Sequence, residues 1–173
     1  EYLLQVNPDE VDEDALADIV NRTISAGAWV IPTMALWEVL YGTIGVDELS
    51  SYSELKYFPP QQVQQWINIH EQRLSNAEFN PVTSRQVIDA RMQVLEALND
   101  AGAGILMGTD APQQFSVPGF SLHRELERME AAGMTPYEIL RTGTHNVGQY
   151  FATTDNFGHV AEGHRADLIL VRA

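Results

Sequence analysis

Residues 104–112 constrain the fold of this chain more than any other stretch. The apolar residues 105–107 lie between two glycines, and Thr109-Asp110-Ala111-Pro112 follows them. A short apolar run bounded by glycines is typical of a strand buried on both faces. Asp110 then lies at the carboxyl end of that strand, where α/β folds place their chemistry. A turn cap before a proline-containing loop explains Asp110 equally well at this point.

Composition limits the class of protein. The 173 residues suffice for one domain with a core, and 45% hydrophobic with 20% charged residues indicates a globular chain. No apolar run approaches the roughly 20 residues of a membrane helix. The net charge is −14 with one lysine, Lys56, which argues against nucleic-acid binding. The absence of cysteine rules out disulfides and thiolate metal sites, and slightly favours the cytoplasm while fitting an exported protein as well.

Helical and strand patterns alternate along the chain. Apolar residues at three- and four-residue spacing predict helices, and short apolar runs predict strands. The expected order is helix 9–26, strand 28–31, helices 34–41, 59–76 and 82–101, strand 104–109, helices 121–132 and 135–150, and strand 166–171. This order favours an α/β fold with a parallel sheet.

Two helix starts carry capping signals. Ser121 is the expected N-cap of the helix over 121–132. Thr135, Pro136 and Glu138 form the pattern of a capping box with proline at the first helical position. These signals fix where the last helices begin.

Three motifs, taken in order, resemble one protein family. They are Gly-Ile-Leu-Met-Gly-Thr-Asp-Ala from 104, Gly-Phe-Ser-Leu-His-Arg-Glu-Leu from 119, and Thr-His-Asn from 144 with Gly-His-Val-Ala-Glu-Gly-His-Arg-Ala-Asp-Leu from 158. Their joint order resembles the C-terminal part of the amidohydrolase superfamily, in its imidazolonepropionase-like and prolidase-like branch. The Ile-Pro-Thr that ends strand 28–31 also fits that branch.

The resemblance implies a fold and its boundaries. Strands 28–31 and 104–109 correspond to the seventh and eighth strands of a (β/α)₈ TIM barrel, so the chain is expected to begin after the sixth strand. Residues 1–153 form this barrel part, with a helical, lid-like insertion around residues 35–80. Residues 154–173 return into a small β-sandwich, where Asp167 helps to anchor the last strand.

The resemblance also implies a chemistry. Asp110 matches the family aspartate that ligates a divalent metal, commonly zinc, and acts as general base for the attacking water. One or two metal ions would serve the hydrolysis of a C–N bond in an amide, dipeptide-like or cyclic-amide substrate. The family's other ligands include a His-x-His pair, and no two of the five histidines here form one.

The histidines have competing interpretations. His123 lies in the helix after Asp110, where it is a candidate substrate-binding residue or an ordinary helix histidine. His70 is expected on the protein surface, and His145 with Asn146 is expected to order a turn. His159 and His164 flank a glycine-rich hairpin and are expected to be exposed.

Two questions stay open from sequence alone. The aromatic residues of the insertion either line a substrate pocket or pack a core. The isolated chain is either the C-terminal part of a working enzyme or a catalytically inactive structural fragment. A fragment with bare strand edges is expected to self-associate as a homo-oligomer.

Overall fold

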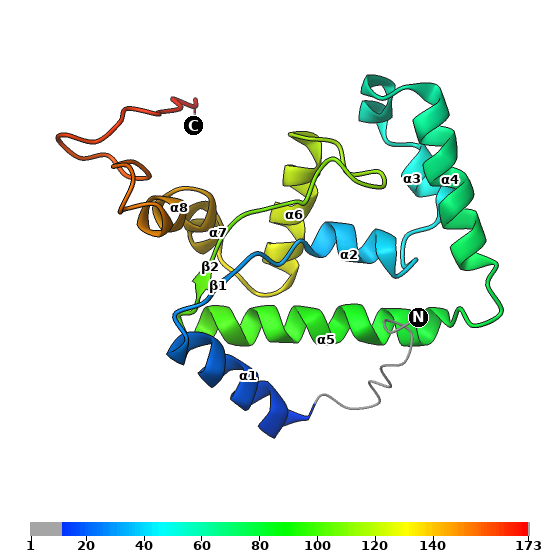
Figure 1. The fold of residues 1–173 in the computed structure, drawn as a ribbon, viewed down its shortest axis with the longest axis horizontal. Coiled ribbons are helices and arrows are strands. Elements are labelled where there is room, and N and C mark those ends of the chain that lie inside the picture. Colours follow the sequence, from blue (N-terminus) through cyan, green and yellow to red (C-terminus); the bar gives the residue numbers. More distant parts are fainter. Residues whose placement is uncertain (1–11, 173) are drawn as a thin grey trace.

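A computed structural model describes residues 12–172, and a parallel pair of strands lies at its centre (Figure 1). Strand β1 (Trp29–Val30) pairs with β2 (Gly104–Ile105), with Trp29 opposite Gly104 and Val30 opposite Ile105. The parallel pairing expected from the element order is confirmed, although both strands are shorter than predicted. A Cβ on Gly104 would lie 2.7 Å from the Trp29 ring, so the absent side chain lets the strands pack closely.

Helices α1 (Glu13–Ser25) and α5 (Pro81–Asp100) pack together on one side of this pair. Asp12 caps α1 by accepting from the backbone N–H groups of Asp14 and Ala15, while residues 9–11 of the predicted helix lie outside the described residues. Within residues 12–172, no helix combines the length and apolarity needed to cross a membrane. The first hydrophobic core joins both helices to the sheet and comprises chiefly Val20, Met34, Ile88, Leu95, Leu98, Ile105 and Met129.

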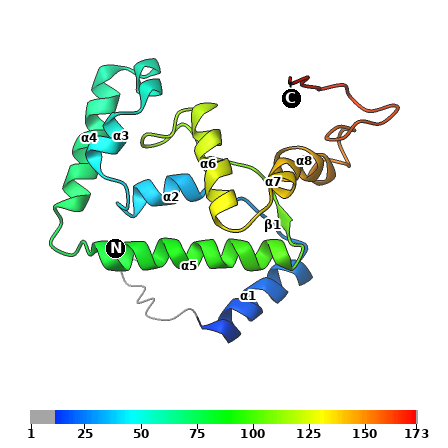
Figure 2. The ribbon, with the colours of Figure 1, turned by 180° about the vertical axis from the view of Figure 1, so that it is seen from behind.

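The helical insertion occupies the side toward which both strands run (Figure 2). It contains α2 (Met34–Leu40), α3 (Val46–Ser50), the 3₁₀ helix η2 (Ser53–Tyr57) and α4 (Pro60–Leu74). A second hydrophobic core holds it together, comprising Val39, Ile44, Leu49, Leu55, Trp66, Phe115 and Val117. The ring centroids of Phe58 and Trp66 lie 4.8 Å apart, so these aromatic rings contribute to core packing.

Three further helices follow β2: α6 (Phe120–Ala131), α7 (Pro136–Gly143) and α8 (His145–Tyr150). The predicted Ser121 cap is wrong, because α6 already begins at Phe120, and the Ser121 hydroxyl donates back to the Val117 carbonyl at 2.9 Å. The continuous helix predicted over 135–150 is also wrong, because Thr144 leaves helical geometry at φ −128 and ψ −88. The capping box of Thr135 and Glu138 is confirmed.

The C-terminal segment differs most from expectation. Residues 166–171 form no strand, and Leu170 is fully exposed. A strand requires a neighbouring chain for its N–H and C=O groups, and nothing within residues 12–172 pairs with this segment. Asp167 accepts a 2.5 Å hydrogen bond from Arg165 Nε, so its side-chain contact is local.

Candidate functional site

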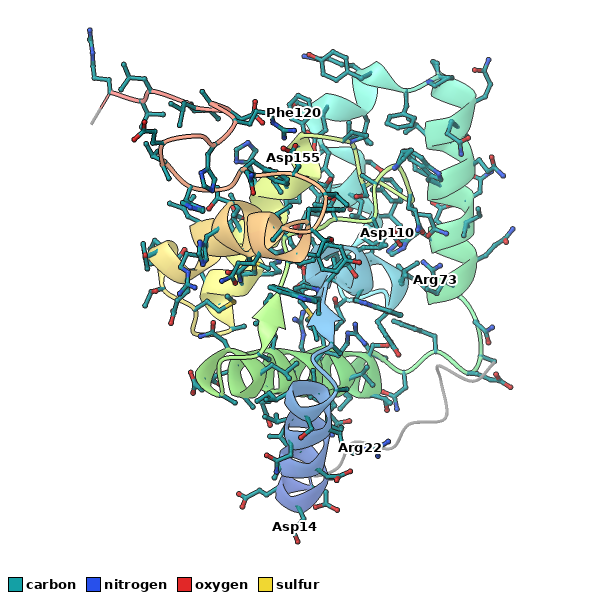
Figure 3. The ribbon with its side chains drawn as sticks, turned by 60° about the vertical axis from the view of Figure 1, so that its left-hand side comes forward. Asp14, Arg22, Arg73, Asp110, Phe120 and Asp155 are labelled. Atoms are coloured by element: carbon teal, nitrogen blue, oxygen red, sulfur yellow. The ribbon has the colours of Figure 1, made fainter. Side chains whose placement is uncertain are left out.

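Asp110 lies shortly after β2, in the loop that follows the carboxyl end of the strand (Figure 3). The residue is exposed and has φ 53, a left-handed conformation that Asp and Asn tolerate better than most residues. Its carboxylate accepts a 2.7 Å hydrogen bond from Gln113 Nε2. No backbone N–H within residues 12–172 donates to this carboxylate, which removes the turn-cap interpretation.

The loop after Asp110 is tightly folded. Gln113 and Ser116 exchange backbone hydrogen bonds of 2.8 and 3.4 Å across a short turn, and the Ala111–Pro112 peptide is cis. Phe115, at φ 57, is 1% exposed and inserts into the second core. The loop therefore carries an outward carboxylate at one end and a buried aromatic anchor at the other.

Asp110 belongs to no three-ligand metal group in the part of the chain that the structure describes. Within residues 12–172, no three His, Asp or Glu side chains come together as a metal-binding group. Stable divalent metal sites in proteins generally need three or more protein ligands. The described residues therefore do not fit a complete metal site, and Asp110 can supply only one ligand of such a site.

Three cavities differ in their position relative to Asp110. The smallest of the three, of about 20 Å³, lies against the Asp110 loop, where Gln114, Phe115 and Ser116 line it together with residues of α2 and α6. One, of about 650 Å³, opens at the amino end of the strands, where Trp29, Gly104, Glu138 and Arg141 contribute to its lining. Another, of about 330 Å³, is mostly apolar and lies between β1 and α5. Asp110 is not part of the lining of either of these two larger cavities.

His123 is exposed on α6. No hydrogen bond or ring contact joins it to Asp110 among the described residues, and its substrate-binding role stays a prediction. Two residues further along the same helix, Glu125 makes the contacts that organise this region.

Glu125 is a buried carboxylate that the sequence analysis did not single out. It is 0% exposed, and its two oxygens accept from the backbone N–H groups of Met34 and Ala35, each at 2.8 Å. These are the first N–H groups of α2, whose N-cap residue Thr33 provides no side-chain cap. Burial raises the pKa of Glu125, while the two hydrogen bonds oppose that shift. Glu125 lies within the motif that begins at Gly119, but the motif does not indicate that its side chain contacts α2.

Two ion pairs extend this contact between α6 and the insertion. Arg128 Nε donates to Glu38 Oε2 at 2.7 Å, and Arg124 pairs with Glu54. Arg124 also lies over the Tyr52 ring, 3.6 Å from its centroid. Both carboxylates are largely buried, so these pairs fix how α6 sits against the insertion.

The surface position predicted for His70 is wrong. His70 is 0% exposed, its Nε2 lies 2.9 Å from the Ile44 carbonyl oxygen, and its Nδ1 lies 3.2 Å from Arg73 Nη1. Burial lowers the pKa of His70. The α4 sequence is polar around this position, and only the loop packed against it makes the site buried.

The remaining histidines lie near α8. Asn146 Nδ2 donates to the Ile105 carbonyl at 2.8 Å and ties the start of α8 to β2, in agreement with the structural role expected for His145-Asn146. The His145 and His159 rings are 5.9 Å apart, and those of His159 and His164 are 4.1 Å apart. His159 is exposed as predicted, whereas His164 is half-buried.

The fold and site define an α/β protein with a carboxylate just past the carboxyl end of a parallel strand. The chain matches the model of the amidohydrolase family over residues 13–173. This match covers nearly all of the chain, and the chain therefore belongs to the amidohydrolase family, a family of hydrolases. Comparison with curated proteins and with solved structures gave no match.

Proposed function

We propose that this chain contributes the general base to a hydrolase that cleaves a C–N bond in an amide, a dipeptide-like substrate or a cyclic amide. The single observation that carries the proposal is the position of Asp110. It is an exposed carboxylate at the carboxyl end of a parallel strand, in a chain of the amidohydrolase family. The superfamily branch, and with it the bond class, rests on the resemblance of the three motifs.

In this proposal β1 and β2 are the seventh and eighth strands of a (β/α)₈ barrel. Three features support it: the strands are adjacent and parallel, α5 crosses between them, and α1 precedes them on the same side. A parallel sheet of two strands leaves two edges that further strands would cover. The helical insertion of residues 35–80 then lies over the end of the barrel that carries the chemistry.

Asp110 transfers a proton in this reaction, first as general base and then as general acid. Its carboxylate accepts a proton from the attacking water and returns it to the leaving nitrogen as the C–N bond breaks. Gln113 orients the carboxylate through its 2.7 Å hydrogen bond. A left-handed backbone just after the strand turns the side chain toward solvent, where a water and a substrate can reach it.

A divalent metal, zinc by the resemblance, would lower the pKa of a bound water and polarise the scissile carbonyl. Residues 12–172 contain no group of three metal-binding side chains, so a metal at Asp110 would need further ligands besides those that the described residues bring together. His123 is proposed as a substrate contact on the helix that follows the Asp110 loop.

Replacement of Asp110 by Asn tests the proposed role. Asn tolerates φ 53 and keeps the shape of the side chain, so the loop should stay folded. Removing a general base costs about 10²–10⁴-fold in turnover, and we expect D110N to lose at least that much in the protein that holds the complete active site. Turnover is measured with N-acyl amino acids, dipeptides and cyclic amides.

The matched control is Asp100→Asn, because Asp100 is exposed at the end of α5, away from the loop. D100N should retain full turnover. Turnover of D110N within a few-fold of the parent protein would refute the role of Asp110.

A second candidate function is favoured because residues 12–172 contain no group of three metal-binding side chains. In this alternative, the chain by itself is an inactive structural unit that associates with copies of itself. The exposed apolar side chains of Ile31 and Leu170 support it.

A further inference from the structure

The loop that carries Asp110 has a conformation that its own hydrogen bonds stabilise only in part. Asp110 and Phe115 both have left-handed backbones, at φ 53 and φ 57, which an L-residue adopts only when its surroundings hold it there. Hydrogen bonds within the loop, from Gln113 to Asp110 and from Ser116 Oγ to the Thr109 carbonyl at 3.4 Å, provide part of that support. The second hydrophobic core and α4 provide further support.

The first contact with α4 is apolar. The centroid of the Phe115 ring lies 5.8 Å from that of Trp66 and 6.1 Å from that of His70. The Phe115 and His70 rings meet edge to face. Phe115 is 1% exposed, so its side chain is enclosed by the insertion rather than by the strands. This places the middle of the loop against one face of α4.

The second contact is polar and comes from one arginine. Arg73 Nη2 donates to Gln114 Oε1 at 3.2 Å, and Arg73 Nη1 donates to the Val39 carbonyl at 3.3 Å. The guanidinium thus joins the Asp110 loop to the end of α2. A planar group with several fixed donors suits this task, and a lysine could not make both bonds in the same way.

His70 completes the arrangement and has only one protonation state that fits it. Nε2 faces a carbonyl oxygen, that of Ile44, and must therefore donate. Nδ1 faces Arg73 Nη1, which is itself a donor, and must therefore accept. His70 is thus neutral with its proton on Nε2, and the lowering of its pKa by burial agrees with this state.

We propose that Arg73 and His70 of α4 are positioning residues that lock the loop after β2 and thereby set the orientation of the Asp110 carboxylate. This inference rests on the proposed function for the catalytic meaning of Asp110. The lock is formed by the Arg73–Gln114 hydrogen bond together with the buried ring of Phe115. Arg73 acts through the loop and touches neither substrate nor reacting atoms.

Amide hydrogen exchange of the 173-residue chain tests the lock without any assay of activity. In Arg73→Gln we expect peptides covering residues 110–117 to exchange at least about 5-fold faster, because a local opening then costs less. Peptides from α1 and α5 should keep the exchange of the parent chain, which shows that the fold survives. Arg85→Gln is the control, since Arg85 is exposed on α5 and should leave the loop unchanged.

A double-mutant comparison assigns the effect to the named contact. Gln114→Ala should also speed exchange of the loop, and Arg73→Gln with Gln114→Ala together should do no more than Arg73→Gln alone. Unchanged loop exchange in Arg73→Gln, or fully additive effects in the double variant, would overturn the lock.

A kinetic measurement on the protein with the complete active site tests positioning itself. Arg73→Gln should lower kcat about 10-fold with little change in KM, because the base is misaligned while the substrate contacts remain. A loosened loop with unchanged kcat would overturn the positioning role. Failure of the proposed function is a separate result: D110N would then stay active, while the exchange data on Arg73 would be unaffected.

Discussion

At the scale of single residues, the most consequential side chain is Glu125, which lies within the second of the three family motifs. Glu125 brings a carboxylate from α6 to the first two N–H groups of α2, across 90 positions of sequence. Those N–H groups have no intrahelical partner, and Thr33 does not cap them. The contact orients α2 and α6, which pack directly against each other.

Replacement of Glu125 by Ala should lower the free energy of unfolding by about 2–4 kcal/mol, because two buried N–H groups lose their acceptor. Urea unfolding followed by circular dichroism measures the change. Glu130→Ala is the matched control, since Glu130 is exposed on the same helix and should change stability by less than about 0.5 kcal/mol. Equal stability of both variants would show that the Glu125 cap contributes nothing.

The lowered pKa of His70 predicts how the free energy of unfolding depends on pH. Its pKa is lowered in the folded chain, so the unfolded chain binds a proton first as the pH falls. Neutral His70 makes its full contribution to the free energy of unfolding above its ordinary pKa of about 6.5. This contribution declines as the pH drops below that value. The raised pKa of Glu125 acts in the opposite direction, because protonation of that buried carboxylate favours the folded chain.

Both the parent chain and a His70 variant contain Glu125. The difference between their free energies of unfolding therefore isolates the contribution of His70. The difference in free energy of unfolding between the parent chain and His70→Gln should shrink from pH 7.5 to pH 5.5. Urea titrations at four pH values provide the measurement. A difference that is constant, or that grows toward acid, would contradict the neutral state of His70.

At the scale of elements, helices with both an apolar period and an end signal were predictable. Helix α7 begins at Pro136 with the capping box that Thr135 and Glu138 indicate. Helix α6 begins one residue before its predicted cap, because Gly119 at φ 84 turns the chain directly into the helix. The break at Thr144 lies beside His145-Asn146, where a turn was expected, and the Asn146 side chain there donates to the distant Ile105 carbonyl.

Thr135→Ala should cost about 1 kcal/mol through loss of the α7 cap. In a chain of this size that corresponds to a fall of about 2–4 °C in Tm, readable by calorimetry. Thr153→Ala is the comparison variant, since Thr153 is exposed beyond α8 and should melt like the parent. If both variants melt together, the capping box makes no contribution to stability.

At the scale of the whole molecule, two strands and a short tail leave backbone and apolar surface open. Strand β1 pairs only with β2 among the described residues, and Ile31 beside it is 54% exposed. The tail adds Ile169 at 91% and Leu170 at 100% exposure. Such surfaces favour association with further chain.

The isolated chain should therefore show a sedimentation mass that rises with concentration. In a second measurement, equilibrium dialysis should find zinc well below one ion per chain. Ile31→Lys with Leu170→Lys should reduce the association, because a charge then lies on each apolar surface. Val82→Lys, at an exposed position on α5, serves as the control. A strictly monomeric chain, or stoichiometric zinc, would contradict the picture of an inactive unit that self-associates.

The amino-acid sequence by itself determined the α/β class, the parallel strands around residues 28–31 and 104–109, the family and the place of Asp110 after the second strand. These features depend on local periodicity, glycine placement and motif order, which can be read from the sequence without knowing which elements pack together. Only the tertiary structure decided that His70 is buried, that Glu125 caps α2 and that Arg73 holds the loop of Asp110. Each of these contacts joins residues far apart in sequence, so burial and hydrogen bonding there depend on which elements pack together.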